Sequence, residues 1–397
     1  KMSETDAFVR KYLQRMAEIR STGGATKETS YYSALENLLN ELGNLLEPKV
    51  ICNGQLRNQG AGHPDFGLYN KKQTSHGEPK PGQIPERGVI EVKPLADKSW
   101  QTAKSEQATK YFNHYKLVLV TNYREFRLIG EDDTGKPVER EFFSLADSEA
   151  AFWTLASNPA KAVKEKGTHF AEFLRRVMMN SAPLSRPEDV AWFLASYARD
   201  ALATLELQDA ATLAPLRKDL ETALGTKFDG DKGEHFFRST LVQTLFYGIF
   251  SAWVLWVKDS GTNNKFDWKS AGFYLTVPMI QSLFQEIAMP TRLKPLGIMG
   301  LLDRTADALN RVDRTAFFSQ FNTGQAVQHF YEPFLEEFDP DLRKQMGVWY
   351  TPPEIVQYMV ERVDHVLRTE LGIADGLADK NVYVLDPCCG TGAFMVE

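Results

Sequence analysis

The spacing of apolar residues over the first 150 positions changes between a helical period and a strand period. A helix is predicted over Glu28–Leu42, where Leu35, Leu38, Leu39 and Leu42 recur at intervals of three and four. Short β-rich runs bounded by Gly and Pro then predict strands, with a second helix after the third strand. These later segments cover residues 49–52, 64–69, 88–93, 99–114 (the helix), 117–121 and 125–129. The expected order for residues 1–150 is therefore αβββαββ.

Residues 151–320 show the helical period almost alone. Helices are predicted near residues 168–179, 187–206, 215–224, 234–257 and 277–288, with Pro183, Pro187, Pro278 and Pro290 between or at the start of them. No pattern of chemically active residues stands out in this region. We interpret it as an all-α connector, or spacer, between two parts of α/β type.

One run in this connector has the length of a membrane span. Ser239–Val257 carries no charged residue, and about 20 apolar residues are enough to cross a bilayer. It includes Thr240, Gln243 and Thr244, however, and no other part of the chain resembles it. A helix buried on all sides by other helices fits these residues better, so we expect no membrane association.

The last region, residues 321–397, returns to an α/β pattern. Asn381–Asp386 predicts a buried strand, Gly390–Gly392 a tight turn, and Ala393–Val396 the start of a helix. A strand, a Gly-rich turn and a helix form the usual cradle for a nucleotide-like cofactor at the edge of an α/β sheet. We therefore expect an α/β multidomain protein whose last part begins a Rossmann-like domain.

Composition changes this picture only slightly. The chain has 397 residues and a formal net charge of -6, which argues against nucleic-acid binding through bulk charge but leaves room for a local basic groove. The three cysteines, Cys52, Cys388 and Cys389, lack the spacing of zinc ligands or of a disulfide framework. We interpret them as typical of a reducing, cytoplasmic compartment.

Two carboxylates and a lysine follow the strands of the first region. Glu91 and Lys93 are two positions apart in one predicted strand, so they share a face, and Asp65 belongs to the preceding strand. Converging carboxylates of this kind suit a hard divalent cation such as Mg²⁺, with Asp65 and Glu91 as ligands. A bound cation would polarise a phosphodiester, and Lys93 would offset the developing charge. The alternative is a solvated Glu91–Lys93 ion pair without catalytic role.

Three further residues fit the same arrangement. Gln107 and Tyr111 share one face of the second predicted helix, and Glu28 begins the first helix, where Glu36 is the competing choice. Together with Asp65…Glu91-X-Lys93 and the element order, the pattern resembles the PD-(D/E)XK nuclease superfamily. The resemblance implies Mg²⁺-dependent DNA cleavage. The residues that it marks as catalytic are Asp65, Glu91 and Lys93, supported by Glu28 and Gln107.

The most specific motif is Asp386-Pro-Cys-Cys-Gly-Thr-Gly-Ala-Phe394. It resembles motif I of the N6-adenine DNA methyltransferases, and Gly347-Val-Trp-Tyr-Thr-Pro352 resembles the segment that precedes motif I in that family. The resemblance implies binding of S-adenosyl-L-methionine. The implied cofactor-binding residues are Tyr350, Thr351, Pro352, Asp386, Pro387, Gly390, Thr391, Gly392 and Phe394. The family's catalytic (Asn/Asp)-Pro-Pro-(Tyr/Phe) motif does not occur by residue 397, so we expect it further along a longer protein.

The order of nuclease-like domain (1–150), helical spacer (151–320) and start of a methyltransferase domain (321–397) resembles single-chain restriction–modification enzymes of type IIG or IIL. The resemblance implies a bacterial phage-defence enzyme that cleaves unmethylated double-stranded DNA and methylates adenine at N6. An alternative remains in which the nuclease-like domain is inactive and serves DNA binding or assembly. Whether cleavage requires a homo-oligomer or an inhibitory partner is left open by the sequence.

Overall fold

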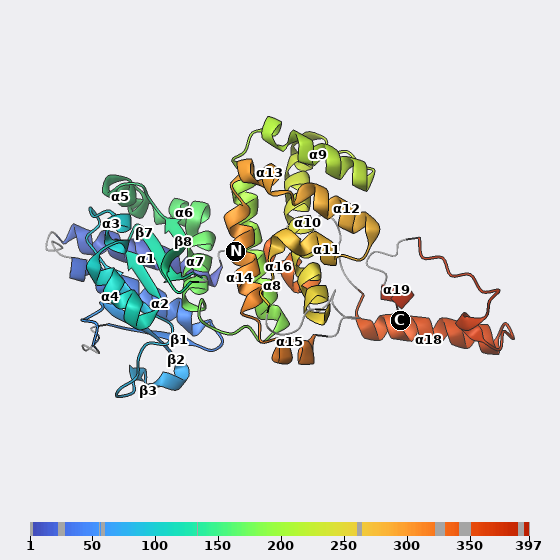
Figure 1. Ribbon diagram of the computed structural model, residues 1–397, viewed down its shortest axis with the longest axis horizontal. Helices are drawn as coiled ribbons and strands as arrows, with labels where there is room; N and C mark the ends of the chain where they lie inside the picture. The colour runs from blue at the N-terminus through green and yellow to red at the C-terminus, as the bar shows by residue number, and fades with distance from the viewer. Residues whose placement is uncertain are drawn as a thin grey trace. The chain divides into compact units, whose positions relative to one another are not determined.

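The computed structural model describes residues 3–22, 28–54, 56, 60–132, 134–259, 264–321, 330–340, 351–387 and 393–396. The chain divides into two compact units, Lys1–Ala182 and Pro183–Glu397. Figure 1 draws both units and labels many of their elements. The three-part division at residues 150 and 320 stays a prediction. By packing, the helices between residues 151 and 182 belong with the first unit.

The first unit is built on a mixed six-stranded sheet in the order β1-β2-β5-β6-β7-β8. β5 and β6 run parallel, and the other neighbouring strands run antiparallel. The strands are β1 Val50–Gly54, β2 Phe66–Asn70, β5 Val89–Val92, β6 Val118–Thr121, β7 Glu125–Glu131 and β8 Pro137–Ser144. The predicted strands are thus present in the predicted order. β8 was missed, as was the small hairpin of β3 (Thr74–Ser75) and β4 (Glu78–Pro79), which lies between the second and third predicted strands.

Helices cover both faces of this sheet. The helices of the unit are α1 Glu4–Ser21, α2 Tyr32–Asn44, α3 Ser99–Ala103, α4 Glu106–Tyr115, α5 Glu149–Ser157, α6 Pro159–Ala162 and α7 Thr168–Met178. On one face, Tyr111 and Phe112 of α4 pack with Val89 and Val120 in one apolar cluster. On the other face, α2 and α7 contact the sheet through ring pairs such as Tyr32–Phe66 and Phe170–Phe126. The result is a sheet between two helical layers.

Local capping decides where two predicted helices begin and end. The helix expected over residues 99–114 is two helices, because the Ser105 hydroxyl accepts a hydrogen bond from the Ala108 amide and starts α4 anew. The helix expected from Glu28 begins as a 3-10 turn, Glu28–Tyr31, and becomes α-helical only at Tyr32. The sequence analysis missed α1, which begins after a Ser3 cap with acidic residues in its first turn.

The second unit is helical over the part of the chain that the structure describes. Its longer helices are α8 Pro187–Glu206, α9 Ala210–Leu224, α10 Gly230–Asp259, α12 Pro278–Ile287, α14 Met299–Asn310 and α18 Pro353–Thr369. Shorter helices are α11 Ala271–Tyr274, α13 Pro290–Leu293, α15 Arg314–Gln320, α16 Glu332–Phe338 and α19 Ala393–Val396. α9 begins five residues earlier than the predicted helix, because the Asp209 carboxylate caps its first turn through the Thr212 amide.

Helix α10 forms the centre of the second unit. It contacts α8, α11, α12 and α14, and its Phe250 ring stacks on Phe330 at 3.4 Å between centroids. Among the described residues, Gly233–Asp259 of this helix is the one segment long and apolar enough to span a membrane, and 61% of its most apolar window is buried. This burial agrees with the prediction of a core helix.

Candidate functional site

Strand pairing brings the predicted catalytic residues of the first unit to one end of the sheet. β2 and β5 are antiparallel with Phe66 opposite Ile90. Asp65 directly precedes β2, and Lys93 directly follows β5. Because the two strands are antiparallel, both residues lie at the same end of the strand pair. The pairing continues through both residues, since the Asp65 amide donates to Ile90 O at 3.1 Å and the Lys93 amide donates to Thr121 O at 2.9 Å. The backbone that carries both groups is thereby fixed.

The Asp65 carboxylate is held through both of its oxygens. Its Oδ2 accepts from the Val92 amide at 2.7 Å, and its Oδ1 accepts from the Tyr32 hydroxyl of α2. Tyr32 was not among the residues singled out from the sequence, and it belongs to no motif that could have indicated it. Asp65 itself is half-buried, so it remains accessible from solvent.

Glu91 is the buried carboxylate of the group. Its residue is 2% exposed, on a central strand, and its Oε1 accepts a hydrogen bond from the Lys93 ammonium at 2.6 Å. The Lys93 side chain is 29% exposed, so it reaches from the buried carboxylate toward solvent. A carboxylate at this depth requires a cationic partner, because burial without one is costly. An ordinary solvated surface pair would not bury Glu91 in this way.

Gln107 and Tyr111 lie next to this group. The Gln107 amide nitrogen donates to the Tyr111 hydroxyl at 2.9 Å, so the two side chains form a unit on α4. Burial raises the pKa of Tyr111, and the hydrogen bond from Gln107 opposes that rise. The negative charges of Glu91 and Asp65 raise the same pKa further, and the Lys93 charge lowers it. The hydroxyl of Tyr111 is therefore within the electrostatic reach of all three motif residues.

Two residues of the first predicted helix, Glu28 and Glu36, were the candidates to join this arrangement. Glu28 starts the 3-10 turn before α2, and its side chain is outside what the structure describes. The competing residue, Glu36, lies one helical turn after Tyr32. Its Oε1 accepts from the Gly54 amide at 3.0 Å, and Gly54 pairs with Phe66, the neighbour of Asp65. Glu36 thus anchors β1 beside the strand that carries Asp65.

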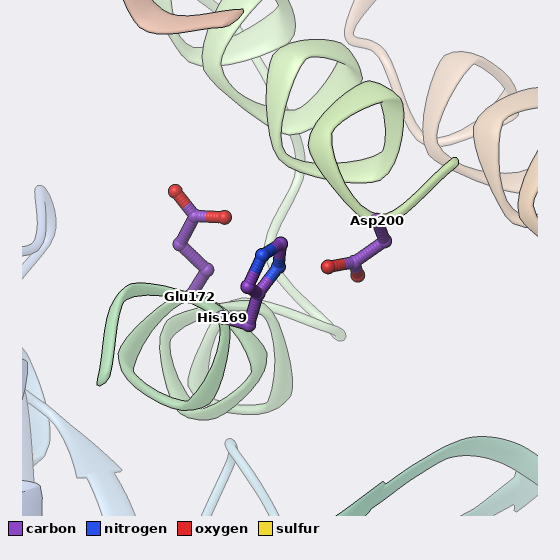
Figure 2. Close-up of side chains that lie close together, drawn as sticks. All are labelled: His169, Glu172 and Asp200. Atoms are coloured by element: carbon purple, nitrogen blue, oxygen red, sulfur yellow. The ribbon is translucent and has the colours of Figure 1, made fainter. Parts of the chain in front are cut away.

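These residues fit a hard cation by their chemistry. Asp65 and Glu91 offer carboxylate oxygens, the ligands that Mg²⁺ prefers, and both are held by neighbouring hydrogen bonds rather than left to rotate. A separate pair of candidate ligands, His169 and Glu172, projects from one side of α7 (Figure 2). The third side chain drawn there, Asp200, belongs to α8 of the second unit. His169 and Glu172 are then only two candidate ligands within the first unit, and we propose no metal site on them.

The predicted cofactor site of the second unit falls partly outside the described residues. Tyr350, Gly390, Thr391 and Gly392 are among the residues that the structure does not describe. Of the remaining residues, Thr351 and Pro352 precede α18, Asp386 and Pro387 lie in an irregular segment, and Phe394 lies in α19. The helix after Gly392 begins where the sequence predicted it, and α18 begins directly after Pro352.

The buried strand predicted over Asn381–Asp386 is wrong. The segment is irregular, and Tyr383 and Leu385 are 92% and 85% exposed. A strand requires a hydrogen-bonded neighbour. Among the described residues of the second unit, the pairing of β type is a single bridge between Leu184 and Val312. The sequence Val-Tyr-Val-Leu therefore has strand composition without a sheet to join.

Comparison with known proteins bears on the two units differently. Residues 322–397 match the model of the N-6 DNA Methylase family, which supports the predicted start of an adenine methylase domain in this part of the chain. No curated protein matches the chain.

One similar solved structure is the cryoEM structure of a DrdV–DNA complex, with 19% sequence identity and a TM-score of 0.35. The match covers 98% of this chain and 34% of that chain, so the present chain spans about a third of its length. At this TM-score the likeness carries no argument about fold or function.

Proposed function

We propose that the first unit is a metal-dependent DNA nuclease of the PD-(D/E)XK type. The observation that carries the proposal is the meeting of Asp65, Glu91 and Lys93 at one end of the β2–β5 pair, with Asp65 held on both oxygens and Glu91 buried against Lys93. Asp65 and Glu91 would hold Mg²⁺, which supplies polarisation of the phosphate when bound. A water oxygen would bond to phosphorus and give up a proton to solvent, while one P–O ester bond breaks and the leaving oxygen takes up a proton.

The chain's own groups have separate tasks in this reaction. The Lys93 ammonium, placed by its bond to Glu91, would donate to the phosphate oxygens as negative charge develops on them. Tyr111 and Gln107 would orient the water or the backbone of the bound strand from the α4 side. The proposed substrate is double-stranded DNA.

We further propose that residues 322–397 begin a DNA adenine methylase domain that uses S-adenosyl-L-methionine. The family match supports this proposal together with the Asp386-Pro…Gly-Thr-Gly392 motif. The methyl group would pass from the cofactor's sulfonium to the N6 atom of adenine, and N6 loses a proton. With the nuclease proposal, this gives a restriction–modification enzyme of the type IIG or IIL kind.

The nuclease proposal is tested by calorimetric titration of the chain with Mn²⁺ and by nicking of supercoiled plasmid DNA. Asp65→Ala should abolish both metal binding and metal-dependent nicking, whereas Glu139→Gln, on the exposed edge strand β8, should change neither. Nicking that persists in Asp65→Ala overturns the assignment. Wild-type protein that binds DNA but no metal would favour the alternative of an inactive nuclease fold used for DNA binding.

The methylase proposal is tested by equilibrium dialysis with radiolabelled S-adenosyl-L-methionine. Asp386→Ala should lower binding by about tenfold or more, because the variant removes the motif's carboxylate and with it the proposed contacts of that group to the ligand. The exposed variant Glu370→Gln, at the end of α18, is the matched control. Equal binding by Asp386→Ala and wild type contradicts the assignment.

A further inference from the structure

Tyr32 is placed to act on the proposed metal site from outside the motif. It is the first residue of α2, and its ring packs on Phe66 with 5.0 Å between centroids. The ring contact fixes the direction of the hydroxyl, which donates to Asp65 Oδ1. Helix α2 is in turn attached to β1 through the side chain of Asn40, which donates to Cys52 O at 3.0 Å and accepts from the Cys52 amide at 2.9 Å. The hydroxyl is thus held by the core rather than by a loop.

One hydrogen bond to the Asp65 carboxylate comes from a strand and the other from a helix. The Val92 amide, on Oδ2, belongs to the strand that carries Glu91, and the Tyr32 hydroxyl, on Oδ1, belongs to a helix. A carboxylate oxygen has two acceptor positions, so one hydrogen bond on each oxygen is compatible with a cation on the same carboxylate. Together the two donors fix the plane of the carboxylate, which a single donor would leave free to rotate.

We infer that Tyr32 is a positioning residue for the proposed divalent-metal site, setting the orientation of Asp65 through its hydroxyl. The inference rests on the nuclease proposal. Tyr32 does not touch the metal or the phosphate in this role. It lowers the entropy cost of metal binding, because Asp65 is already oriented before the cation arrives. Loss of such an outer partner typically weakens metal affinity or activity by 10- to 100-fold.

The test is Tyr32→Phe, which removes the hydroxyl and keeps the ring on Phe66. Titration of the full chain with Mn²⁺ should show a Kd raised about 10-fold or more, with a thermal midpoint close to that of wild type. The matched control is Tyr31→Phe, one residue earlier, where the ring packs on Tyr123 and Trp153 away from Asp65. Tyr31→Phe should leave the Kd for Mn²⁺ unchanged.

A second measurement separates positioning from damage to the fold. In plasmid nicking, Tyr32→Phe should regain most of the wild-type rate when Mn²⁺ is raised in proportion to the new Kd, because only metal occupancy has been lost. A misfolded site would not be rescued by metal. The inference is overturned if Tyr32→Phe binds Mn²⁺ with the same Kd as the wild type. It is also overturned if Tyr32→Phe loses nicking that added Mn²⁺ does not restore. Absence of metal binding in the wild type overturns the nuclease proposal instead.

Discussion

The two motif-bearing segments of this chain differ in how completely their surroundings are assembled. Around Asp65, paired strands and two helices fix each predicted group, and Glu91 is 2% exposed. Around Asp386, the preceding segment is irregular, with Leu385 85% exposed. The second motif is the more specific sequence pattern, yet the first is the one whose residues the structure describes in full. The specificity of a sequence motif is therefore separate from how its surroundings fold, because only the surroundings depend on neighbouring strands.

The largest expected difference between the units is in their response to alkaline pH. Burial raises the pKa of several tyrosines in the first unit, Tyr12, Tyr31, Tyr69, Tyr111 and Tyr115, and that of Tyr69 reaches about 12. In the unfolded chain these phenols ionise near pH 10. Above that pH the unfolded state binds fewer protons than the folded state, so stability is full below about pH 10 and falls as pH rises toward the folded values.

Alkylation of the buried Cys52 thiol, followed by peptide mass spectrometry, measures this opening of the first unit. Labelling of Cys52 should accelerate above about pH 10. The variant Tyr69→Phe removes one ionising group and should shift the onset upward. Onset at the same pH in Tyr69→Phe would contradict a role for that phenol.

The next largest effect is expected at a buried ion pair of the first unit. Arg176 Nε lies 2.9 Å from Glu141 Oε2, and both side chains are almost fully buried, which joins α7 to β8. Arg176→Met removes the cationic partner of a buried carboxylate and should lower the free energy of unfolding by about 3–5 kcal/mol in denaturant titrations. The exposed pair Lys161–Glu165 is the control, and Lys161→Met should cost no more than about 0.5 kcal/mol. Equal losses in the two variants would refute the argument.

A smaller effect is expected from overpacking in the second unit. A Cβ added at Gly248 of α10 would overlap the Phe284 ring of α12. Gly248→Ala should therefore destabilise the second unit by about 1–3 kcal/mol. At Gly300 of α14 the nearest atom is Arg304 Nη2 at 3.8 Å, so Gly300→Ala should instead stabilise by about 0.5–1 kcal/mol. Thermal unfolding should show a loss of stability in Gly248→Ala and a gain of stability in Gly300→Ala. A change of the same sign in both variants would contradict the packing argument.

The smallest effect is expected in the segment before Asp386. Leu385→Ser should change the free energy of unfolding by less than about 0.5 kcal/mol, because its side chain makes few contacts. The comparison is Leu119→Ser on β6, which is 1% exposed and should be severely destabilising. A loss of more than about 2 kcal/mol in Leu385→Ser would show that this segment is packed after all.

The convergence of Asp65, Glu91 and Lys93 could be predicted from the sequence, because it follows from local periodicity. Glu91 and Lys93 share a strand face by the period of two, and antiparallel pairing then brings Asp65 to their end of the sheet. Tyr32 could not be predicted in the same way. Its contact with Asp65 depends on where α2 packs against β2, and Tyr32 lies 33 residues before Asp65 in the chain.

The errors have physical causes of the same kind. The predicted strand over Asn381–Asp386 followed from composition, but a strand exists only when another strand pairs with it. The helix expected over residues 99–114 missed the Ser105 cap, because a helical apolar pattern continues across the break. At α4 and α9, side-chain hydrogen bonds from Ser105 and Asp209 determined where the helix begins.

The position of β5 in the sheet has a consequence for local stability. β5 has a hydrogen-bonded neighbour on each side, β2 and β6, and all its residues are buried. Opening of this strand therefore requires the loss of both ladders, the kind of event that coincides with global unfolding in native-state amide exchange. We therefore expect the Glu91 backbone to belong to the slowest-exchanging part of the first unit, so that the proposed chemistry would take place where the fold fluctuates least.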